Sequence, residues 1–156
     1  DTRQFESDPD YQVHKLTPQR WHFCCRAGHP LTEQEAVQAR DLFDYPMATT
    51  FRPPNIRKIL SDLSGRQDFL PAVECEHGYA LLNVVMHSDT IGIACNANLR
   101  PYQREGGLVQ LKLADLTPEQ EEACHTRYGV VSRVGYGLSP LAQGLVRQLI
   151  ACDTGL

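Results

Sequence analysis

The chain has 156 residues, a formal net charge of −4 and 42% hydrophobic residues, which fits one globular domain or two small lobes and excludes a disordered or fibrous protein. Its arginines are scattered rather than gathered in a basic stripe, so this segment is not expected to bind nucleic acid itself. No apolar run approaches the ~20 residues of a membrane helix, and the polar start DTRQFESDPD is not a signal peptide.

Strand and helix patterns alternate along most of the chain. Period-two and short apolar runs predict strands, whereas apolar residues at intervals of three and four predict helices. In chain order we predict a loop over 1–10, strands over 11–16 and 20–28, a helix over 32–43, a strand over 45–51, a helix over 54–64, a strand over 69–75, a helix over 77–87, strands over 89–96 and 108–113, a helical turn from 118, a strand over 128–134 and a helix over 140–150. This alternation predicts an α/β fold with a mostly parallel sheet covered by helices.

Local signals mark where these helices begin or end. Thr32 and Glu35 have the spacing of a capping box, which predicts the start of the first helix. Pro54 opens the second helix, and Gly65 is placed to close it. Thr117 is expected to cap the short helical turn that follows it, because acidic residues fill its first positions.

The last predicted helix has a serine cap at Ser139, a proline at its first position and one apolar face. The residues of this face are Leu141, Ala142, Leu145, Val146, Leu149 and Ile150. We expect the face to be buried on a sheet that contains the strand over 128–134. Because residues 1–10 supply neither a helix nor a strand pair for that sheet, this lobe is expected to be incomplete.

The six cysteines are expected to be reduced, which favours a cytoplasmic protein. Cys24 and Cys25 are adjacent in a predicted strand and therefore point to opposite faces. The other cysteines lie in or beside apolar runs, where free cysteine behaves as a small hydrophobe. No C-x₂-C pair, P-loop, G-x-G-x-x-G or G-x-S-x-G motif occurs, so we predict no metal, no cofactor and no catalytic residue.

Four segments resemble, in this order, the C-terminal effector-binding domain of LysR-type transcriptional regulators. They are RWHFCCRAGHPLTEQ, DLFDYPMATT, MHSDTIGIACNANL and YGVVSRVGYGLSPLAQGLVRQLI. The most specific features are His29-Pro30-Leu31 after a strand, Asp41-Leu42 before Tyr-Pro, and LSPLA at the start of the last helix. The resemblance extends from Asp1 to about Ala151.

The resemblance implies a periplasmic-binding-protein-like fold of two α/β lobes joined by two crossing strands, with an effector in the cleft between them. It assigns 1–21 to a remnant of the first lobe, 22–126 to a complete second lobe, and 127–156 to the return strand and last helix of the first lobe. The family's N-terminal winged helix-turn-helix is not represented here, so we expect an N-terminally truncated fragment. Operator DNA would be bound only through that absent domain.

The strongest candidate effector contacts are Thr49, Thr50 and Phe51, between a predicted strand and a predicted helix. Ligands of α/β sheets bind beyond the carboxyl ends of strands, where hydroxyl groups and free backbone N–H groups of a helix start can bind a carboxylate. The alternative is that the threonines are ordinary turn residues. The resemblance also places effector contacts in this turn.

Weaker candidates lie at other junctions of the chain. Glu76 and His77 precede a predicted helix, where Glu76 alternatively only complements the helix dipole. Ser88 is a possible cleft residue, although the neighbouring His87 and Asp89 cannot form a catalytic triad with it because consecutive side chains do not converge. Under the resemblance, Thr2 and Arg3 would line the cleft, unless this terminus is frayed.

The sequence thus predicts a ligand sensor of a bacterial, cytoplasmic transcriptional regulator and not an enzyme. The expected partners are a small organic, aromatic or sugar acid and further copies of the chain in a homodimer or homotetramer, with no membrane. One alternative is an α/β enzyme that uses Cys75 as a nucleophile beside His77. The other is a periplasmic solute-binding protein, which shares the two-lobe architecture.

Overall fold

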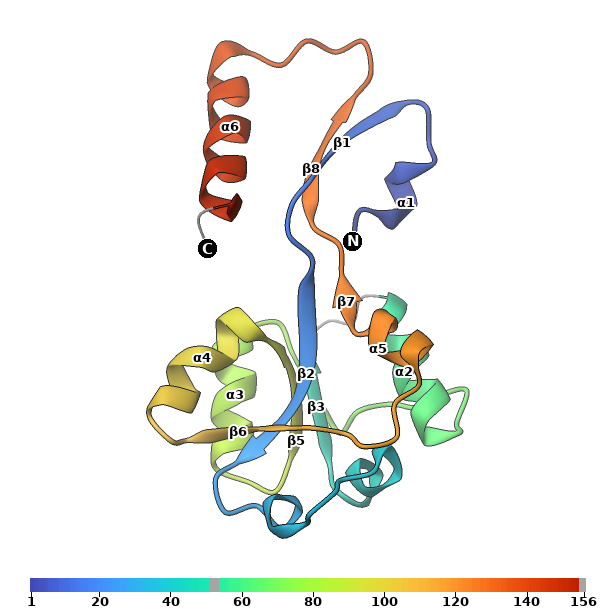
Figure 1. The fold of residues 1–156 in the computed structure, drawn as a ribbon, viewed down its shortest axis with the longest axis vertical. Helices are drawn as coiled ribbons and strands as arrows, with labels where there is room; N and C mark the ends of the chain where they lie inside the picture. Colours follow the sequence, from blue (N-terminus) through green and yellow to red (C-terminus); the bar gives the residue numbers. More distant parts are fainter. Residues whose placement is uncertain (51–53, 155–156) are drawn as a thin grey trace. The chain divides into compact units, whose positions relative to one another are not determined.

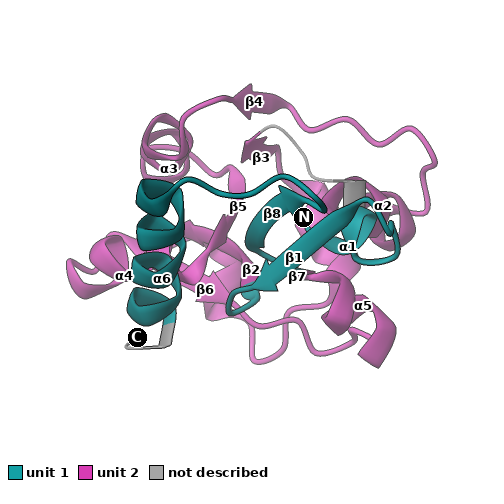
Figure 2. Cartoon of the chain, turned by 90° about the horizontal axis from the view of Figure 1, so that it is seen from above, with its two compact units in different colours: residues 1–19, 126–156 teal, residues 20–125 magenta. Residues whose placement is uncertain are grey.

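The computed structural model describes residues 1–50 and 54–154. These residues form two compact units, shown in Figure 2 in teal and magenta. Unit 1 contains residues 1–19 and the C-terminal segment from Thr126, and unit 2 contains Arg20–His125. The predicted turn residue Phe51 lies outside the described residues.

Unit 1 is built around two antiparallel strands, β1 (Tyr11–Lys15) and β8 (Gly129–Arg133). Gly129 lies opposite Lys15, and a Cβ atom there would stand 2.7 Å from the His14 carbonyl oxygen and 2.9 Å from the Thr2 methyl group. Only glycine allows this close approach. Both strands agree with the sequence-based expectation.

The first residues of the chain differ from the predicted loop, because Arg3–Glu6 forms the one-turn helix α1. Asp1 supports this turn: its carboxylate accepts hydrogen bonds from the backbone N–H of Arg3 at 2.9 Å and from the Arg3 side chain at 2.7 Å. An acidic residue at the start of a helix favours the helical turn. The polar composition alone did not indicate it.

The helix α6 (Pro140–Thr154) is present, and the Ser139 hydroxyl accepts a hydrogen bond from the Ala142 N–H at 3.2 Å. The predicted burial of its apolar face is wrong, because Leu141, Leu145 and Leu149 are 85%, 60% and 42% exposed. Unit 1 offers this helix only the two-stranded sheet of β1 and β8 among its described strands.

Unit 2 holds a mixed sheet with the strand order β4-β3-β5-β2-β6. Figure 1 labels β3, β5, β2 and β6 of this sheet. β3 pairs in parallel with β4 and β5, whereas β2 is antiparallel to β5 and β6. β7 also pairs with β2 and stands outside this linear strand order. The bounds are β2 Gln19–Arg26, β3 Met47–Thr50, β4 Val73–Cys75, β5 Ile91–Cys95, β6 Leu108–Leu111 and β7 His125–Thr126.

Two apolar clusters cover the two faces of this sheet. Cys25 lies in one cluster with Ile56 and Leu60 of α2 (Pro54–Ser64), and Cys24 lies in the other with Leu81 of α3 (Gly78–Met86). Adjacent residues of a strand point to opposite faces, so these two cysteines divide the core as expected. Gly65 ends α2 with φ of +66°, as its position after the helix predicted.

The predicted helix over 32–43 is wrong, since the segment forms two 3₁₀ helices, η1 (Pro30–Glu33) and η2 (Ala39–Asp44). The predicted capping box is not used, because the Thr32 hydroxyl donates to the His29 carbonyl at 2.7 Å. Between the two helices Val37 forms a parallel bridge with Leu113. A continuous helix would break that bridge and expose the buried Val37 side chain.

The remaining differences concern lengths and one missed helix. The strand predicted over 69–75 shortens to β4, and Leu70 is 73% exposed. Tyr79 is 80% exposed, so α3 is not buried all round. α4 (Asn96–Arg104) was not predicted, whereas α5 (Pro118–Ala123) has the expected Thr117 cap.

None of the described helices is long and apolar enough to cross a membrane.

Candidate functional site

The carboxyl ends of β3, β4 and β5 lie at one edge of the unit 2 sheet because these strands run in the same direction. Each strand is followed by a helix, so the amino ends of α2, α3 and α4 face the same edge. We call it the strand-end edge. Partial positive charge at helix starts and unpaired backbone N–H groups make such an edge suitable for an anionic or polar ligand.

The two predicted threonines lie at the end of β3 on this edge. Thr49 is only 2% exposed, and its hydroxyl donates to the Thr50 carbonyl at 3.1 Å. Thr50 is half-buried and pairs with Cys75 at the end of β4. The Thr49 hydroxyl is therefore engaged within the strand, and Thr50 is the more accessible of the two hydroxyl groups.

Glu76 and His77 lie at the neighbouring strand end, between β4 and α3. Both are exposed. His77 is the residue before the first turn of α3, with extended backbone angles, and its side chain makes no capping hydrogen bond. The structure thus brings the Glu76–His77 pair and the Thr49–Thr50 pair to the ends of adjacent parallel strands.

A small cavity of about 150 Å³ lies between the first turns of α3 and α4, close to this edge. Gly78 and Tyr79 line it from α3, and Asn98 and Tyr102 line it from α4. The two tyrosine rings meet edge to face, with centroids 6.5 Å apart. The missed helix α4 therefore supplies half of this cavity.

Asn96, the first residue of α4, is a functional candidate that the sequence reasoning missed. Burial lowers the pKa of the His22 imidazole, the positive charge of Arg20 lowers it further, and the Asn96 side chain has a smaller effect that raises it. The available signal was the polar run Asn96-Ala97-Asn98 directly after an apolar strand. Pro101 inside the helix obscured it.

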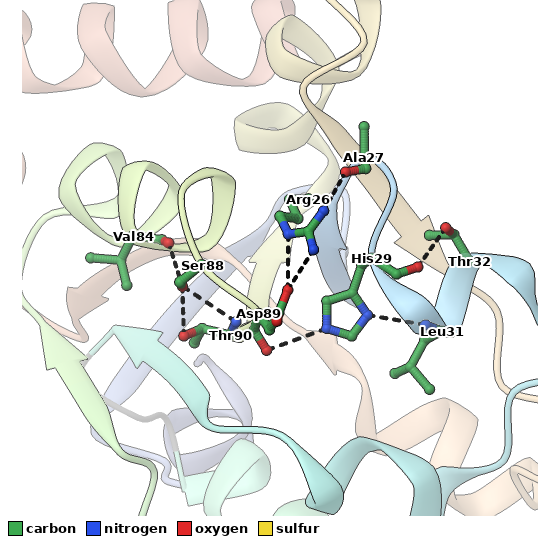
Figure 3. A network of polar contacts seen from close by, with 9 residues as sticks. All are labelled: Arg26, Ala27, His29, Leu31, Thr32, Val84, Ser88, Asp89 and Thr90. Carbon is green, nitrogen blue, oxygen red and sulfur yellow. Dashed lines mark hydrogen bonds and ion pairs between the residues drawn. The ribbon is translucent and has the colours of Figure 1, made fainter.

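Ser88 is not brought together with these residues. It lies at the amino end of β5, opposite the strand-end edge, in the polar network of Figure 3. Its hydroxyl lies 2.7 Å from the Val84 carbonyl oxygen and 2.8 Å from the Thr90 hydroxyl. The Ser88 hydroxyl therefore stabilises the turn between α3 and β5, which is a structural role.

Thr2 and Arg3 belong to unit 1 and have partners within it. Thr2 is 4% exposed, its hydroxyl donates to Glu6 at 3.1 Å, and its backbone N–H donates to the Arg127 carbonyl at 2.8 Å. The Arg3 guanidinium pairs with Asp1 at 2.7 Å. Local hydrogen bonds and one ion pair thus order this end of the chain, which does not support the alternative of a frayed terminus.

The six cysteines are all free, and Cys75 packs against the apolar cluster that contains Leu81. This packing accounts for Cys75 as a small hydrophobic residue of β4. Among the described residues, no group of three or more His, Cys, Asp or Glu side chains is placed to hold a metal ion.

Comparisons with known proteins agree with the fold. The family described as the LysR substrate binding domain matches residues 2–151. The SDS degradation transcriptional activation protein of Pseudomonas sp. (strain ATCC 19151) is 33% identical over 147 residues, which are 93% of this chain and 46% of that protein. The chain therefore spans about half the length of the curated relative it matches.

Solved structures show the same architecture at low sequence identity. The effector binding domain of QuiR in complex with shikimate matches with a TM-score of 0.68 and 16% identity, over 96% of this chain and 68% of that chain. The regulatory domain of CcmR from Synechocystis PCC6803 in complex with 2-PG matches with a TM-score of 0.72 and 16% identity, over 96% and 70%. The resemblance stated from the sequence is confirmed, and the chain belongs to the LysR substrate-binding domain family, with the periplasmic-binding-protein-like α/β fold of that family.

Proposed function

We propose that this chain is the effector-sensing part of a bacterial transcriptional regulator, which binds a small molecule and makes or breaks no covalent bond. The family match over residues 2–151 is the observation that carries the proposal. The strand-end edge supports it, since three parallel strands and three helix starts converge there. Cys75 packs into an apolar cluster, so the alternative of a cysteine-dependent enzyme gains no support from its surroundings.

The proposed ligand is a small organic, aromatic or sugar acid. A carboxylate would be bound by the Thr50 hydroxyl and by backbone N–H groups at the helix starts, with His77 at the neighbouring strand end. Thr49 positions this strand end, and Phe51 remains a predicted contact outside the described residues. Thr2 and Arg3 remain predicted contacts on the family resemblance alone.

Signal transmission would follow from differential binding. An effector that binds one arrangement of the protein more tightly than another shifts the population towards it. In the longer protein, this shift would change the geometry of a homodimer or homotetramer and hence the spacing of DNA-binding domains outside this chain. The named function of the Pseudomonas relative, transcriptional activation, is consistent with this mode of action in the cytoplasm of a bacterium.

A thermal-shift screen tests the proposal directly. The panel contains organic, aromatic and sugar acids, together with shikimate and 2-PG, because structural neighbours were solved with these two ligands. A ligand at about 100 times its Kd adds about 2.7 kcal/mol to the free energy of unfolding. We expect a hit whose shift is largely lost in Thr50→Ala.

Ser88→Ala is the matched control, since it also removes one hydroxyl group from unit 2 but at the opposite edge of the sheet. It should lower the melting temperature of the free protein, because the Val84 and Thr90 contacts are lost, and retain the ligand-induced shift. A full shift in Thr50→Ala would remove Thr50 from the site. Turnover of any panel compound by the purified chain would contradict the proposal of a sensor.

A further inference from the structure

The strand-end edge continues past β5 onto β2 and β6. β2 is antiparallel to both β5 and β6, so β6 runs in the same direction as β5 and ends at the edge where β2 begins. Trp21, near the start of β2, pairs with Cys95, the last residue of β5. The first residues of β2 and the residue that follows β6 therefore belong to the same edge as Thr50 at the end of β3.

Polar side chains of β2 leave one face of the sheet at this edge. Cys24 lies in the apolar cluster that contains Leu81 of α3. His22 and Arg20 are two and four positions before Cys24, so they leave β2 on the same face as Cys24. This is the face of the sheet that α3 covers.

The end of β6 adds a third polar side chain to this face. Phe23 pairs with Leu111, so continuing the antiparallel register by one residue places Lys112 beside His22. Residues that lie opposite each other in neighbouring strands leave the same face. We call Arg20, His22 and Lys112 the basic cluster.

Thr50 leaves β3 on the same face as the basic cluster. It is two positions after Ala48, and Ala48 lies in the same apolar cluster as Cys24. β5 lies between β3 and β2, and neighbouring strands are about 4.8 Å apart, so the end of β3 and the start of β2 are about 10 Å apart. α4 begins at Asn96, directly after β5, so its first backbone N–H groups face the same stretch of the edge. One extended ligand can therefore contact Thr50 at one end and the basic cluster at the other.

Two atoms of the basic cluster are buried and unsatisfied. The Nε atom of Arg20 and the Nε2 atom of His22 have no hydrogen-bond partner among the described residues. Both residues line a cavity of about 290 Å³, and Lys112 lines it too. Buried polar atoms without partners are rare in folded proteins, so two on one face of one strand indicate a place for a polar group of a ligand.

The charges of the cluster define which group would suit it. The Arg20 guanidinium pairs with Glu121 at 3.0 Å, so these two charges offset each other. Burial lowers the pKa of His22 and the charge of Arg20 lowers it further, so the imidazole is neutral at neutral pH. Lys112 is exposed and has no ion-pair partner in the described part of the chain. The cluster thus combines one uncompensated positive charge with several N–H donors, which suits one carboxylate.

We infer that the effector is a dicarboxylate, with one carboxylate bound at Thr50 and the second bound by the basic cluster. The second carboxylate would accept hydrogen bonds from the Arg20 Nε–H and the Lys112 ammonium group. This inference rests on the proposed function, because it adds a second point of contact to the same edge. It makes Arg20 and Lys112 specificity-determining residues, which select a diacid over an acid with a single charge.

Calorimetric titration of the chain with three simple acids tests the inference. Adipate has a carboxylate at each end of a methylene chain, hexanoate has the same number of carbon atoms but one carboxylate, and malonate holds its two carboxylates too close together to reach both contact points. We expect saturable binding of adipate. Hexanoate and malonate should each bind about tenfold more weakly, because each leaves one contact point empty.

Variants assign each carboxylate to its contact point. Lys112→Gln should weaken adipate binding about tenfold and leave hexanoate binding unchanged, whereas Thr50→Ala should weaken the binding of both acids. Arg20→Lys keeps the charge beside Glu121 but removes the Nε–H donor, so it too should weaken adipate alone. Lys58→Gln is the matched control, since it removes one lysine charge from the exposed surface of α2 and should bind adipate as the unmodified chain does.

Several results would overturn the inference. These are the absence of saturable adipate binding, equal affinity for adipate and hexanoate, and unchanged adipate affinity in Lys112→Gln. Loss of adipate binding in Lys112→Gln but not in Thr50→Ala would also overturn it, because the ligand would then have only one point of contact. A monocarboxylate from the thermal-shift panel that loses its shift in Thr50→Ala, in a chain that does not prefer adipate, would support the proposed function while contradicting the dicarboxylate, so the two proposals fail separately.

Discussion

The imidazole of His29 joins two turns through its contact with Asp89, whose carbonyl oxygen lies 3.3 Å from Nε2 (Figure 3). The other ring nitrogen, Nδ1, accepts a hydrogen bond from the Leu31 N–H at 3.1 Å. The Arg26 guanidinium pairs with the Asp89 carboxylate at 2.7 Å and ties the end of β2 to the same turn. His29 is 0% exposed, so the two hydrogen bonds of its ring are largely shielded from water, whereas the Arg26–Asp89 ion pair lies at the surface.

His29→Ala should therefore destabilise the protein substantially. The substitution leaves the Leu31 N–H and the Asp89 carbonyl without partners and opens a cavity beside Tyr45, whose ring centroid is 4.5 Å from that of His29. Large-to-small substitutions at buried sites cost about 2–5 kcal/mol. Urea unfolding measures this loss. His87→Ala, which removes an exposed histidine with one hydrogen bond to Asn83, should cost less than about 1 kcal/mol, and equal losses in the two variants would contradict the assignment.

The role of His29 also shows where sequence reasoning fell short. The Thr32–Glu35 spacing predicted a capping box, but the His29 ring takes the capping position one turn earlier and the segment folds as η1. A cap by Thr32 and a cap by His29 would each bind unpaired N–H groups at a helix start. The spacing of residues in the sequence does not show which of the two caps forms. The tertiary contact with Asp89, 60 residues away, decides between them.

Gly92 should resist substitution because three strands meet around it. It pairs with Cys24 of β2 and Ala48 of β3, and an added Cβ would lie 2.7 Å from a methyl carbon of Val85 and 3.0 Å from the Cys24 sulfur. Overpacking of this kind costs about 1–3 kcal/mol, so Gly92→Ala should lower the urea midpoint.

A double-variant cycle tests the cause of that loss. Val85→Ala removes the clashing methyl groups, so Gly92→Ala should cost less in its presence than alone. Gly137→Ala is the control, since no atom lies within 4 Å of its added Cβ. Strictly additive effects of Gly92→Ala and Val85→Ala would show that the close contact is not the source of the loss.

The protein should lose stability on mild acidification through His22. Burial and the Arg20 charge lower the folded-state pKa of His22 below its ordinary value of 6.5. As the pH falls below 6.5, His22 becomes protonated in the unfolded chain but stays neutral in the folded one until its lowered pKa is reached. The free energy of unfolding therefore decreases with falling pH over this range. His22→Gln should flatten this dependence between neutral pH and the lowered folded-state pKa. Urea titrations at a series of pH values measure the slope, and an unchanged slope in His22→Gln would exclude His22 as its source.

Cysteine reactivity should follow burial. Burial raises the pKa of Cys24 to about 12 and the pKa of Cys25 and Cys124 to about 11, so these thiols are protonated at neutral pH. Iodoacetamide reacts with thiolates, so we expect these three cysteines to be labelled only after unfolding. The exposed Cys152 should react first, and Cys152→Ser should remove that phase. A fast phase that instead maps to Cys75 would revive the cysteine-nucleophile alternative.

Much of the candidate site was accessible from the sequence because strand ends and helix starts carry local signals. Thr49, Thr50, Glu76 and His77 were placed correctly at junctions, since Pro54 and the apolar runs mark them. Ser88 was grouped with them because it too lies at a junction, yet the direction of β5 puts it at the opposite edge. The cavity between α3 and α4 had no local signal, because its walls come from two helices and only tertiary structure brings them together.

The apolar face of α6 shows most directly that a periodic sequence pattern can predict a helix without predicting how that helix packs. Helical periodicity identifies the stripe, but it does not specify what covers it, and Leu141 and Leu145 are 85% and 60% exposed in this chain. Leu141→Gln combined with Leu145→Gln should therefore change the free energy of unfolding of this chain by less than about 1 kcal/mol, since surface substitutions are usually within about 0.5 kcal/mol each. It should also reduce the binding of a fluorescent hydrophobic dye. Leu81→Gln, at a fully buried position of α3, is the matched control and should destabilise strongly; a comparable loss from the α6 double substitution would mean that the stripe is packed against the chain in solution.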